Sequence, residues 1–171
     1  MKKILIAALS ANGKIAREDG GSSLKWTSKE DTQYFIQRTK RAKNLIMGRK
    51  TFETINKPLK DRTVYVLTTH QELLKKQLTD VVFTNESPEQ LIKKLEKKGE
   101  KECCIAGGKS IYEQFLNLSL VDELHLTLEP FIFKTGTNLA DRLEKDLKLE
   151  LISTEKLNNS TLLLKYKVFK V

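Results

Sequence analysis

The segment Glu102-Cys103-Cys104-Ile105-Ala106-Gly107-Gly108-Lys109-Ser110 carries a short apolar run into a glycine pair and then into a helix. The run at 102–106 predicts a buried strand, and the apolar spacing at 109–116 predicts a helix. Glycine lets a ligand approach the backbone closely. A helix that begins there offers free N–H groups and a positive dipole end to an anion. The segment therefore predicts a strand-turn-helix unit with room for a phosphate.

The same alternation extends along the chain on both sides of this segment. Strand-like runs lie at 4–9, 44–47, 63–67 and 81–84, and helical spacing lies at about 28–40, 51–55, 71–78 and 88–98. Three further strand-like runs, at 123–128, 149–154 and 161–168, follow without helices between them, and Asn158-Asn159-Ser160 predicts a turn before the last. We expect an α/β fold with a central, mostly parallel eight-stranded sheet, about four flanking helices and an antiparallel C-terminal hairpin. The length of 171 residues fits a single domain spanning 1–171.

The charge of the chain favours anionic partners. Lys and Arg number 31 against 22 Asp and Glu, which gives a net charge of +9. Nucleotides, polyanionic substrates and nucleic acid all fit this charge. Aromatic residues make up only 7% of the chain, and no interleaved basic and aromatic platform of the kind that binds single strands is evident. A non-enzymatic nucleotide-binding or nucleic-acid-binding module is therefore the third hypothesis, and we expect no nucleic-acid partner.

Other classes of protein are disfavoured by simple features of the sequence. The first apolar run is too short for a signal peptide, and no run approaches the roughly twenty residues that cross a bilayer. We therefore expect a cytoplasmic protein with no membrane partner. The two histidines, His70 and His125, stand apart from any spaced cluster of cysteines or carboxylates, so no metal site is expected.

Two more strand-to-helix junctions resemble the one at Gly107-Gly108. They are Met47-Gly48-Arg49-Lys50-Thr51 and Leu67-Thr68-Thr69-His70. The carboxyl ends of parallel strands share one edge of an open sheet, so we expect all three junctions there. Each alone is a weak signal, but three together predict a dinucleotide site. A complete G-x-G-x-x-G fingerprint is absent, which disfavours an ordinary Rossmann cofactor domain.

A candidate carboxylate lies in the first helix. Ser28 is a good N-cap, and Asp31, Phe35 and Thr39 share one face of the predicted helix at i, i+4 and i+8. An Asp in a first turn commonly serves only to complement the helix dipole. Trp26 precedes it by five residues, however, so the alternative is a carboxylate at the edge of an aromatic pocket that grips a planar N–H and NH₂ edge.

Read together, these segments resemble the dihydrofolate reductase superfamily in order from Ile4 to about Thr127. The resemblance is carried by the first strand followed by Asn12-Gly13-Lys14-Ile15-Ala16, by Trp26 with Asp31, by residues 47–53 and by residues 106–116. It implies reduction of 7,8-dihydrofolate to 5,6,7,8-tetrahydrofolate by hydride transfer from NADPH to C6 of the pterin, within one-carbon metabolism. It also implies a small-molecule substrate, and we expect a monomer, with a dimer as the alternative.

The resemblance assigns roles residue by residue. The catalytic residues it implies are Asp31 and Trp26. The substrate-binding residues it implies are Ile6, Ala8, Asp31, Phe35, Arg62 and Thr127. The cofactor-binding residues it implies are Ala8, Ile15, Gly48, Arg49, Lys50, Thr51, Leu67, Thr68, Thr69, Ala106, Gly107, Gly108, Lys109, Ser110, Ile111 and Tyr112. The loop 12–25 is the corresponding candidate for an active-site lid.

One departure points to a second member of the same superfamily. The family usually has a proline before the motif tryptophan, whereas Leu24-Lys25-Trp26-Thr27-Ser28 is more similar to the reductase domain of riboflavin biosynthesis. The alternative function is therefore a 5-amino-6-(5-phosphoribosylamino)uracil reductase. Asp31 and Arg62 together favour dihydrofolate, since the forked guanidinium of Arg62 suits the glutamate carboxylate of a folate.

Overall fold

The computed structural model describes residues 1–18 and 21–169. The strands are β1 (Lys2–Ser10), β2 (Lys14–Ala16), β3 (Asn44–Gly48), β4 (Thr63–Leu67), β5 (Val81–Thr84), β6 (Glu102–Ile105), β7 (Glu123–Glu129), β8 (Thr137–Asn138), β9 (Leu149–Lys156) and β10 (Leu162–Val168). The helices are α1 (Lys29–Ala42), α2 (Arg49–Ile55), α3 (Gln71–Leu74), α4 (Pro88–Lys97) and α5 (Lys109–Asn117), with a 3₁₀ turn η1 (Ser23–Lys25) before α1.

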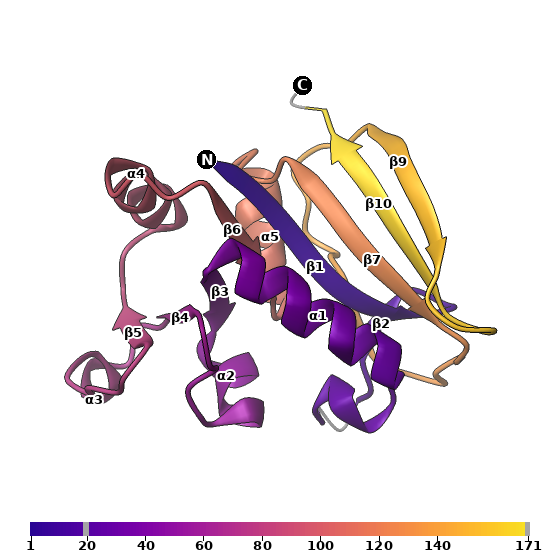
Figure 1. Ribbon diagram of the computed structural model, residues 1–171, viewed down its shortest axis with the longest axis horizontal. Coiled ribbons are helices and arrows are strands. Elements are labelled where there is room, and N and C mark those ends of the chain that lie inside the picture. The colour runs from indigo at the N-terminus through magenta and orange to yellow at the C-terminus, as the bar shows by residue number, and fades with distance from the viewer. Residues whose placement is uncertain (19–20, 170–171) are drawn as a thin grey trace.

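Eight of the described strands form one twisted sheet in the order β5-β4-β3-β6-β1-β7-β10-β9 (Figure 1). The neighbours from β5 to β7 are parallel, and β7, β10 and β9 pair antiparallel. The predicted fold class is confirmed, including the C-terminal hairpin of β9 and β10. Because β3, β4 and β6 are parallel, their carboxyl ends lie at one edge of the sheet, where the three predicted junctions meet.

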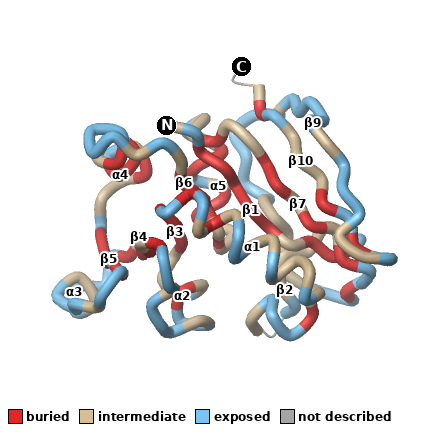
Figure 2. The backbone as a smooth tube through the Cα atoms, viewed as in Figure 1, coloured by how far each residue is buried: buried red, intermediate tan, exposed pale blue. Residues whose placement is uncertain are grey.

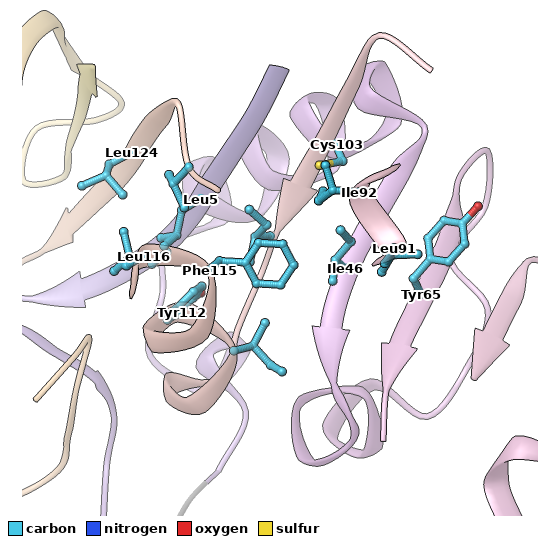
Figure 3. Packing of buried hydrophobic residues seen from close by; sticks show 14 of the residues in the cluster. Leu5, Ile46, Tyr65, Leu91, Ile92, Cys103, Tyr112, Phe115, Leu116 and Leu124 are labelled. Carbon is cyan, nitrogen blue, oxygen red and sulfur yellow. The ribbon is translucent and has the colours of Figure 1, made fainter. Parts of the chain in front are cut away.

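Each face of the sheet is covered by its own set of helices. One apolar cluster joins Leu5, Ile46 and Ile105 to α4 and α5, with Phe115 fully buried at its centre (Figure 3). The other cluster joins the alternate residues Ile4 and Leu45 to α1, α2 and α3. The strands between the two layers are the most buried part of the chain (Figure 2). This alternation follows from the two-residue repeat of a strand.

Two elements differ in detail from the expectation. The helix predicted for 71–78 is the single turn α3, because Leu78 leaves the helix and forms an antiparallel bridge with Val81. Within loop 12–25, β2 pairs antiparallel with β8, so Lys14 lies opposite Asn138. Residues 19–20 of that loop lie outside the described residues. Among the described helices, none is both long and apolar enough to span a membrane.

Candidate active site

The three predicted junctions lie side by side at the carboxyl edge of the sheet. Gly48, which ends β3 and caps α2, donates its backbone N–H to the Gly107 carbonyl at 2.7 Å. Leu67, at the end of β4, lies opposite Gly48 in the parallel register. Ala106 donates its backbone N–H to the Ile46 carbonyl at 2.9 Å. Backbone hydrogen bonds therefore join the first two junctions, and the β3–β4 pairing adds the third.

The glycines at these junctions occupy positions that a side chain would fill. A Cβ on Gly107 would lie 3.0 Å from the Tyr112 ring, and Gly107 has a φ of +92°. A Cβ on Gly48 would lie 3.0 Å from Cγ1 of Ile111, and one on Gly108 would lie 3.2 Å from Oγ1 of Thr51. The Gly107–Gly108 peptide bond is cis. The three glycines are thus required by close packing against Tyr112, Ile111 and Thr51, which brings the backbone of the two junctions together.

Tyr112 connects this glycine loop to the first strand. Its hydroxyl donates a hydrogen bond to the Ile6 carbonyl at 2.8 Å, and its ring packs against Gly107. The side chain is fully enclosed, and burial raises the pKa of Tyr112 well above the usual value, with the negative charge of Asp31 acting in the same direction. The Tyr112 hydroxyl is therefore a fixed donor that sets the position of the loop relative to β1.

The predicted basic residues reach the same edge, but two of them are already paired. Arg49 makes an ion pair with Glu53 at 2.6 Å, and Lys109 pairs with Asp141. Lys50 and Ser110 are exposed at the first turns of α2 and α5. Any anion that uses Arg49 or Lys109 at this edge would therefore compete with Glu53 and Asp141.

The third junction supplies hydroxyl groups at the end of β4. Thr68 is buried, and its Oγ1 accepts a hydrogen bond from the backbone N–H of His70 at 3.1 Å. Thr69 and His70 are exposed on the same turn, and His70 caps α3. Thr69 is therefore free to face a ligand, while Thr68 shapes the turn that presents it.

Asp31 lies half-buried in the first turn of α1. Ser28 is the N-cap as predicted, and its Oγ accepts a hydrogen bond from the Asp31 backbone N–H at 3.2 Å. Burial raises the pKa of the Asp31 carboxyl above its usual value; hydrogen bonding to Thr127 opposes this rise, and the charge of Glu129 adds to it. Asp31 is thus a partly desolvated carboxyl group beside β7, suited to binding a planar donor edge.

Trp26 is buried directly before α1. Its ring meets Phe133 edge-on, with 5.0 Å between the ring centroids. Its Nε1 donor is buried and has no hydrogen-bond partner among the described residues. A buried donor without a partner is costly, so Nε1 is suited to a bound water or ligand.

Arg62 is held against the same helix farther along its length. Arg62 as a whole is 7% exposed; its guanidinium donates to the Thr39 hydroxyl, and its Nε has no hydrogen-bond partner among the described residues. Phe35 lies between Asp31 and Thr39 in sequence and packs against the apolar cluster under α1. Asp31 and Phe35 therefore lie on α1, and Arg62 contacts the same helix from the segment before β4.

The remaining predicted residues surround this helix and the glycine loop. Ala8 of β1 lies opposite Thr127 of β7 in the register, and Thr127 is buried. Ile15 of β2 packs against the α5 side of the core. The structure therefore brings the predicted cofactor residues and Asp31 toward the carboxyl end of the sheet, on both sides of β1. Arg62 lies at the other end, directly before β4.

Two groups of residues near the site were not among the predictions. Glu129 is 3% exposed and hydrogen-bonds Ser28. Asn138 of β8 is within 2.5 Å of both the Lys14 ammonium and the Asp141 carboxylate, so it connects β2 to the partner of Lys109. The alternation of polar His125, Thr127 and Glu129 with leucines in β7 is the signal that could have revealed the first group. Within residues 1–18 and 21–169, no three His, Cys, Asp or Glu side chains are arranged to hold a metal ion.

Comparison with protein families shows which proteins this chain is similar to. The family described as Dihydrofolate reductase matches residues 3–156. A dihydrofolate reductase of Mycoplasma genitalium is 30% identical over 155 residues, which cover 91% of this chain and 93% of the relative. The uncharacterized protein YwjB of Bacillus subtilis is 28% identical over 162 residues, covering 90% of this chain and 91% of the relative.

Two solved structures with different descriptions share the fold of this chain. A putative riboflavin biosynthesis protein from Shewanella sp. PV-4 superposes with a TM-score of 0.85 at 25% identity, covering 99% of this chain and 100% of the other. A dihydrofolate reductase from Enterococcus faecalis, complexed with NADP(H) and RAB-propyl, superposes with a TM-score of 0.73 at 22% identity, covering 99% of this chain and 97% of the other.

Proposed function

This chain belongs to the dihydrofolate reductase family, and we propose that it reduces 7,8-dihydrofolate to 5,6,7,8-tetrahydrofolate with NADPH. The observation that carries the proposal is the placement of two groups along α1: Asp31 lies in its first turn, and Arg62, from the segment before β4, is held against Thr39 near its end. Arg62 contacts Thr39, eight residues beyond Asp31, which is about 12 Å along a helix axis. A carboxyl group for a ring edge and a guanidinium for a distant carboxylate match the two ends of a folate. We place the whole activity in one cytoplasmic domain of residues 1–171, acting as a monomer.

The glycine loop and its neighbours fit a nicotinamide dinucleotide. The lack of a Cβ at Gly48, Gly107 and Gly108 lets the two junctions pack closely against Ile111, Tyr112 and Thr51 at this edge. Arg49, Lys50 and Thr51 would hold the pyrophosphate, and Thr69 with His70 would hold the 2′-phosphate. Ser110 and Lys109, at the first turn of α5, would contribute further contacts. Bound NADPH supplies the hydride for the reaction.

The protein's own part of the chemistry centres on Asp31. Its carboxylate would accept hydrogen bonds from the pterin N3–H and 2-amino group, which fixes the ring for reaction. The N5 proton would come from solvent, and the negative charge of Asp31 would favour the protonated imine electrostatically. Phe35 would pack on the ring, and Arg62 would fork onto the α-carboxylate of the glutamate tail. Trp26 Nε1 would hold a water beside the ring.

A second candidate function is supported by the fold comparison. The Shewanella protein described as a putative riboflavin biosynthesis protein superposes better than the Enterococcus dihydrofolate reductase. The corresponding activity is reduction of 5-amino-6-(5-phosphoribosylamino)uracil. Such a substrate carries a phosphate and no glutamate tail, so it gives Arg62 a different partner and leaves the Asp31–Arg62 pair unexplained.

The deciding experiment follows the decrease of the NADPH absorbance band with each substrate in turn. We expect turnover of dihydrofolate, loss of most turnover in Asp31→Asn and normal activity in Asp146→Asn, which removes an exposed carboxylate far along the chain. Arg62→Leu should raise the KM for dihydrofolate and leave the Kd for NADPH unchanged. Turnover of the phosphoribosyl substrate alone would replace the first proposal with the second.

A further inference from the structure

Glu129 is a buried carboxylate that the proposed reaction does not use. It ends β7, and one of its oxygens, Oε1, accepts hydrogen bonds from both the backbone N–H and the Oγ of Ser28, each at 2.8 Å. The other oxygen, Oε2, accepts a hydrogen bond from Oγ1 of Thr161 at 3.0 Å. Three donors converge on one carboxylate that is only 3% exposed, which is the environment that a buried charge requires.

These contacts lead directly to Asp31. The Ser28 hydroxyl donates to Glu129 and accepts from the Asp31 backbone N–H. Ser28 therefore links the end of β7 to the backbone of the first turn of α1. Thr161 stands where β10 begins, after the hairpin turn. The chain of hydrogen bonds Thr161–Glu129–Ser28–Asp31 therefore connects the C-terminal hairpin to the proposed catalytic residue.

A parallel contact supports the same docking of hairpin and helix. The Asn158 side chain donates to the Glu30 carboxylate at 3.0 Å. Its own oxygen accepts from the backbone N–H groups of Ser160 and Thr161, at 2.8 and 2.9 Å. The hairpin turn is thus rigidified and is joined to the first turn of α1 at two points.

Glu129 also places negative charge on the strand face that Asp31 contacts. In β7, residues 125, 127 and 129 project to the same face, because side chains alternate along a strand. Thr127, in the middle, acts to lower the pKa of Asp31, and Tyr112 of α5 is a further titratable group that interacts with Asp31. The charge of Glu129 contributes to the raised pKa of Asp31. Two acidic groups thus share one corner of the site.

We propose that Glu129 is a positioning residue for Asp31, which holds the first turn of α1 in place through Ser28 and places a negative charge on the face of β7 beside Asp31. The kinetic consequence rests on the proposed function. The effect on the ionisation of Asp31 does not, because it requires only the folded protein.

The test compares Glu129→Gln with Glu155→Gln, which removes an exposed carboxylate from the same hairpin. The Gln side chain retains an oxygen for Ser28 and removes the charge. The readout is the carbon NMR titration of the Asp31 carboxyl group in the ligand-free protein, assigned with Asp31→Asn. We expect the midpoint of Asp31 to move to lower pH in Glu129→Gln and to stay in place in Glu155→Gln. An unmoved midpoint in folded Glu129→Gln overturns the proposal.

A kinetic measurement then separates positioning from charge. Glu129→Ala removes both functions and should lower kcat more than Glu129→Gln does. In Glu129→Gln, the ionisation of Asp31 in the pH profile of kcat/KM should move in the same direction as the NMR midpoint. Equal kcat in Glu129→Ala and wild type would overturn the positioning role. If the wild type fails to reduce dihydrofolate, the proposed function fails, while the NMR titration still decides the role of Glu129.

Discussion

The hydroxyl of Tyr34 lies 2.6 Å from Nδ1 of His125, and this contact joins α1 to β7 about one helical turn beyond Asp31. On the other side of the ring, Nε2 of His125 lies 3.0 Å from the Glu123 carboxylate. A neutral imidazole with its proton on Nε2 satisfies both partners, because it accepts from Tyr34 and donates to Glu123. Burial lowers the pKa of His125, although hydrogen bonding to Glu123 opposes this shift.

The lowered pKa of His125 predicts a loss of stability in mild acid. The unfolded histidine takes up a proton near its ordinary pKa of 6.5, whereas the folded one does so only at lower pH. The contribution of His125 is therefore present above about pH 6.5 and is lost as the pH falls from there through the folded pKa. We expect the free energy of unfolding, measured in urea at a series of pH values, to fall over this window.

The matched variant is His125→Gln, which retains a donor and does not titrate. Its stability should be lower than wild type at neutral pH by about 1–3 kcal/mol, because the single Gln amide cannot reach both Tyr34 and Glu123 and the Tyr34 hydroxyl loses the Nδ1 acceptor. The difference from wild type should shrink as the pH falls below 6.5. A constant difference across this range would show that His125 does not titrate in the way that the structure indicates.

Asp31 should carry a cost in stability. Its folded pKa lies above the ordinary value of 3.8, so stability that is present below pH 3.8 is lost as the pH rises through the folded pKa. Asp31→Asn should therefore be more stable than wild type at neutral pH while losing its activity, which is the usual trade-off at a functional site. Thermal unfolding at pH 4 and pH 7 would check this, and a stabilisation that does not grow with pH would contradict the assignment.

Local sequence features predicted which helix and strand ends surround the candidate active site. The Ser28 cap, the three junctions and the placement of Asp31 follow from short-range rules on caps and parallel strands. Contacts between distant segments could not be predicted in this way. Glu129 and Ser28 are 101 residues apart, and the pairing of β2 with β8 depends on two short strands with no pattern of their own.

The cations illustrate the same limit. The sequence placed Arg49 and Lys109 at helix N-termini facing a phosphate. In the structure, Arg49 already forms an ion pair with Glu53, and Lys109 forms one with Asp141. The sequence shows that Glu53 stands four residues after Arg49, where an ion pair can form. It does not show whether that pair persists when a ligand binds, because a surface ion pair is worth less than about 1 kcal/mol and forms or breaks easily.

Gly107 and Gly108 should respond differently to an added methyl group. Gly107 has a positive φ, and its Cβ would lie 3.0 Å from the buried Tyr112 ring, so Gly107→Ala should cost about 1–3 kcal/mol of stability and greatly weaken NADPH binding. At Gly108 the Cβ would meet only the Thr51 hydroxyl, at 3.2 Å, and its φ is not positive. Gly108→Ala should therefore fold almost normally. Urea unfolding and NADPH fluorescence titration of both variants test this, and equal loss of stability would contradict it.

The ion pair between Arg49 and Glu53 predicts a gain in cofactor affinity when Glu53 is neutralised. Glu53 is half-exposed and contacts Arg49 with both of its oxygens, at 2.6 and 2.8 Å. An exposed i,i+4 pair contributes about 0.3–0.5 kcal/mol, so releasing Arg49 for the phosphates should lower the Kd for NADPH about twofold. Glu53→Gln should show this gain at low salt and lose it at high salt, since exposed charges are screened. Glu144→Gln, which neutralises an exposed glutamate on the loop before β9, is the control and should not change the Kd. If Glu53→Gln and wild type bind NADPH equally at low salt, Arg49 does not contact the cofactor phosphates. Lys50 and the first turn of α5 would then form the pyrophosphate site.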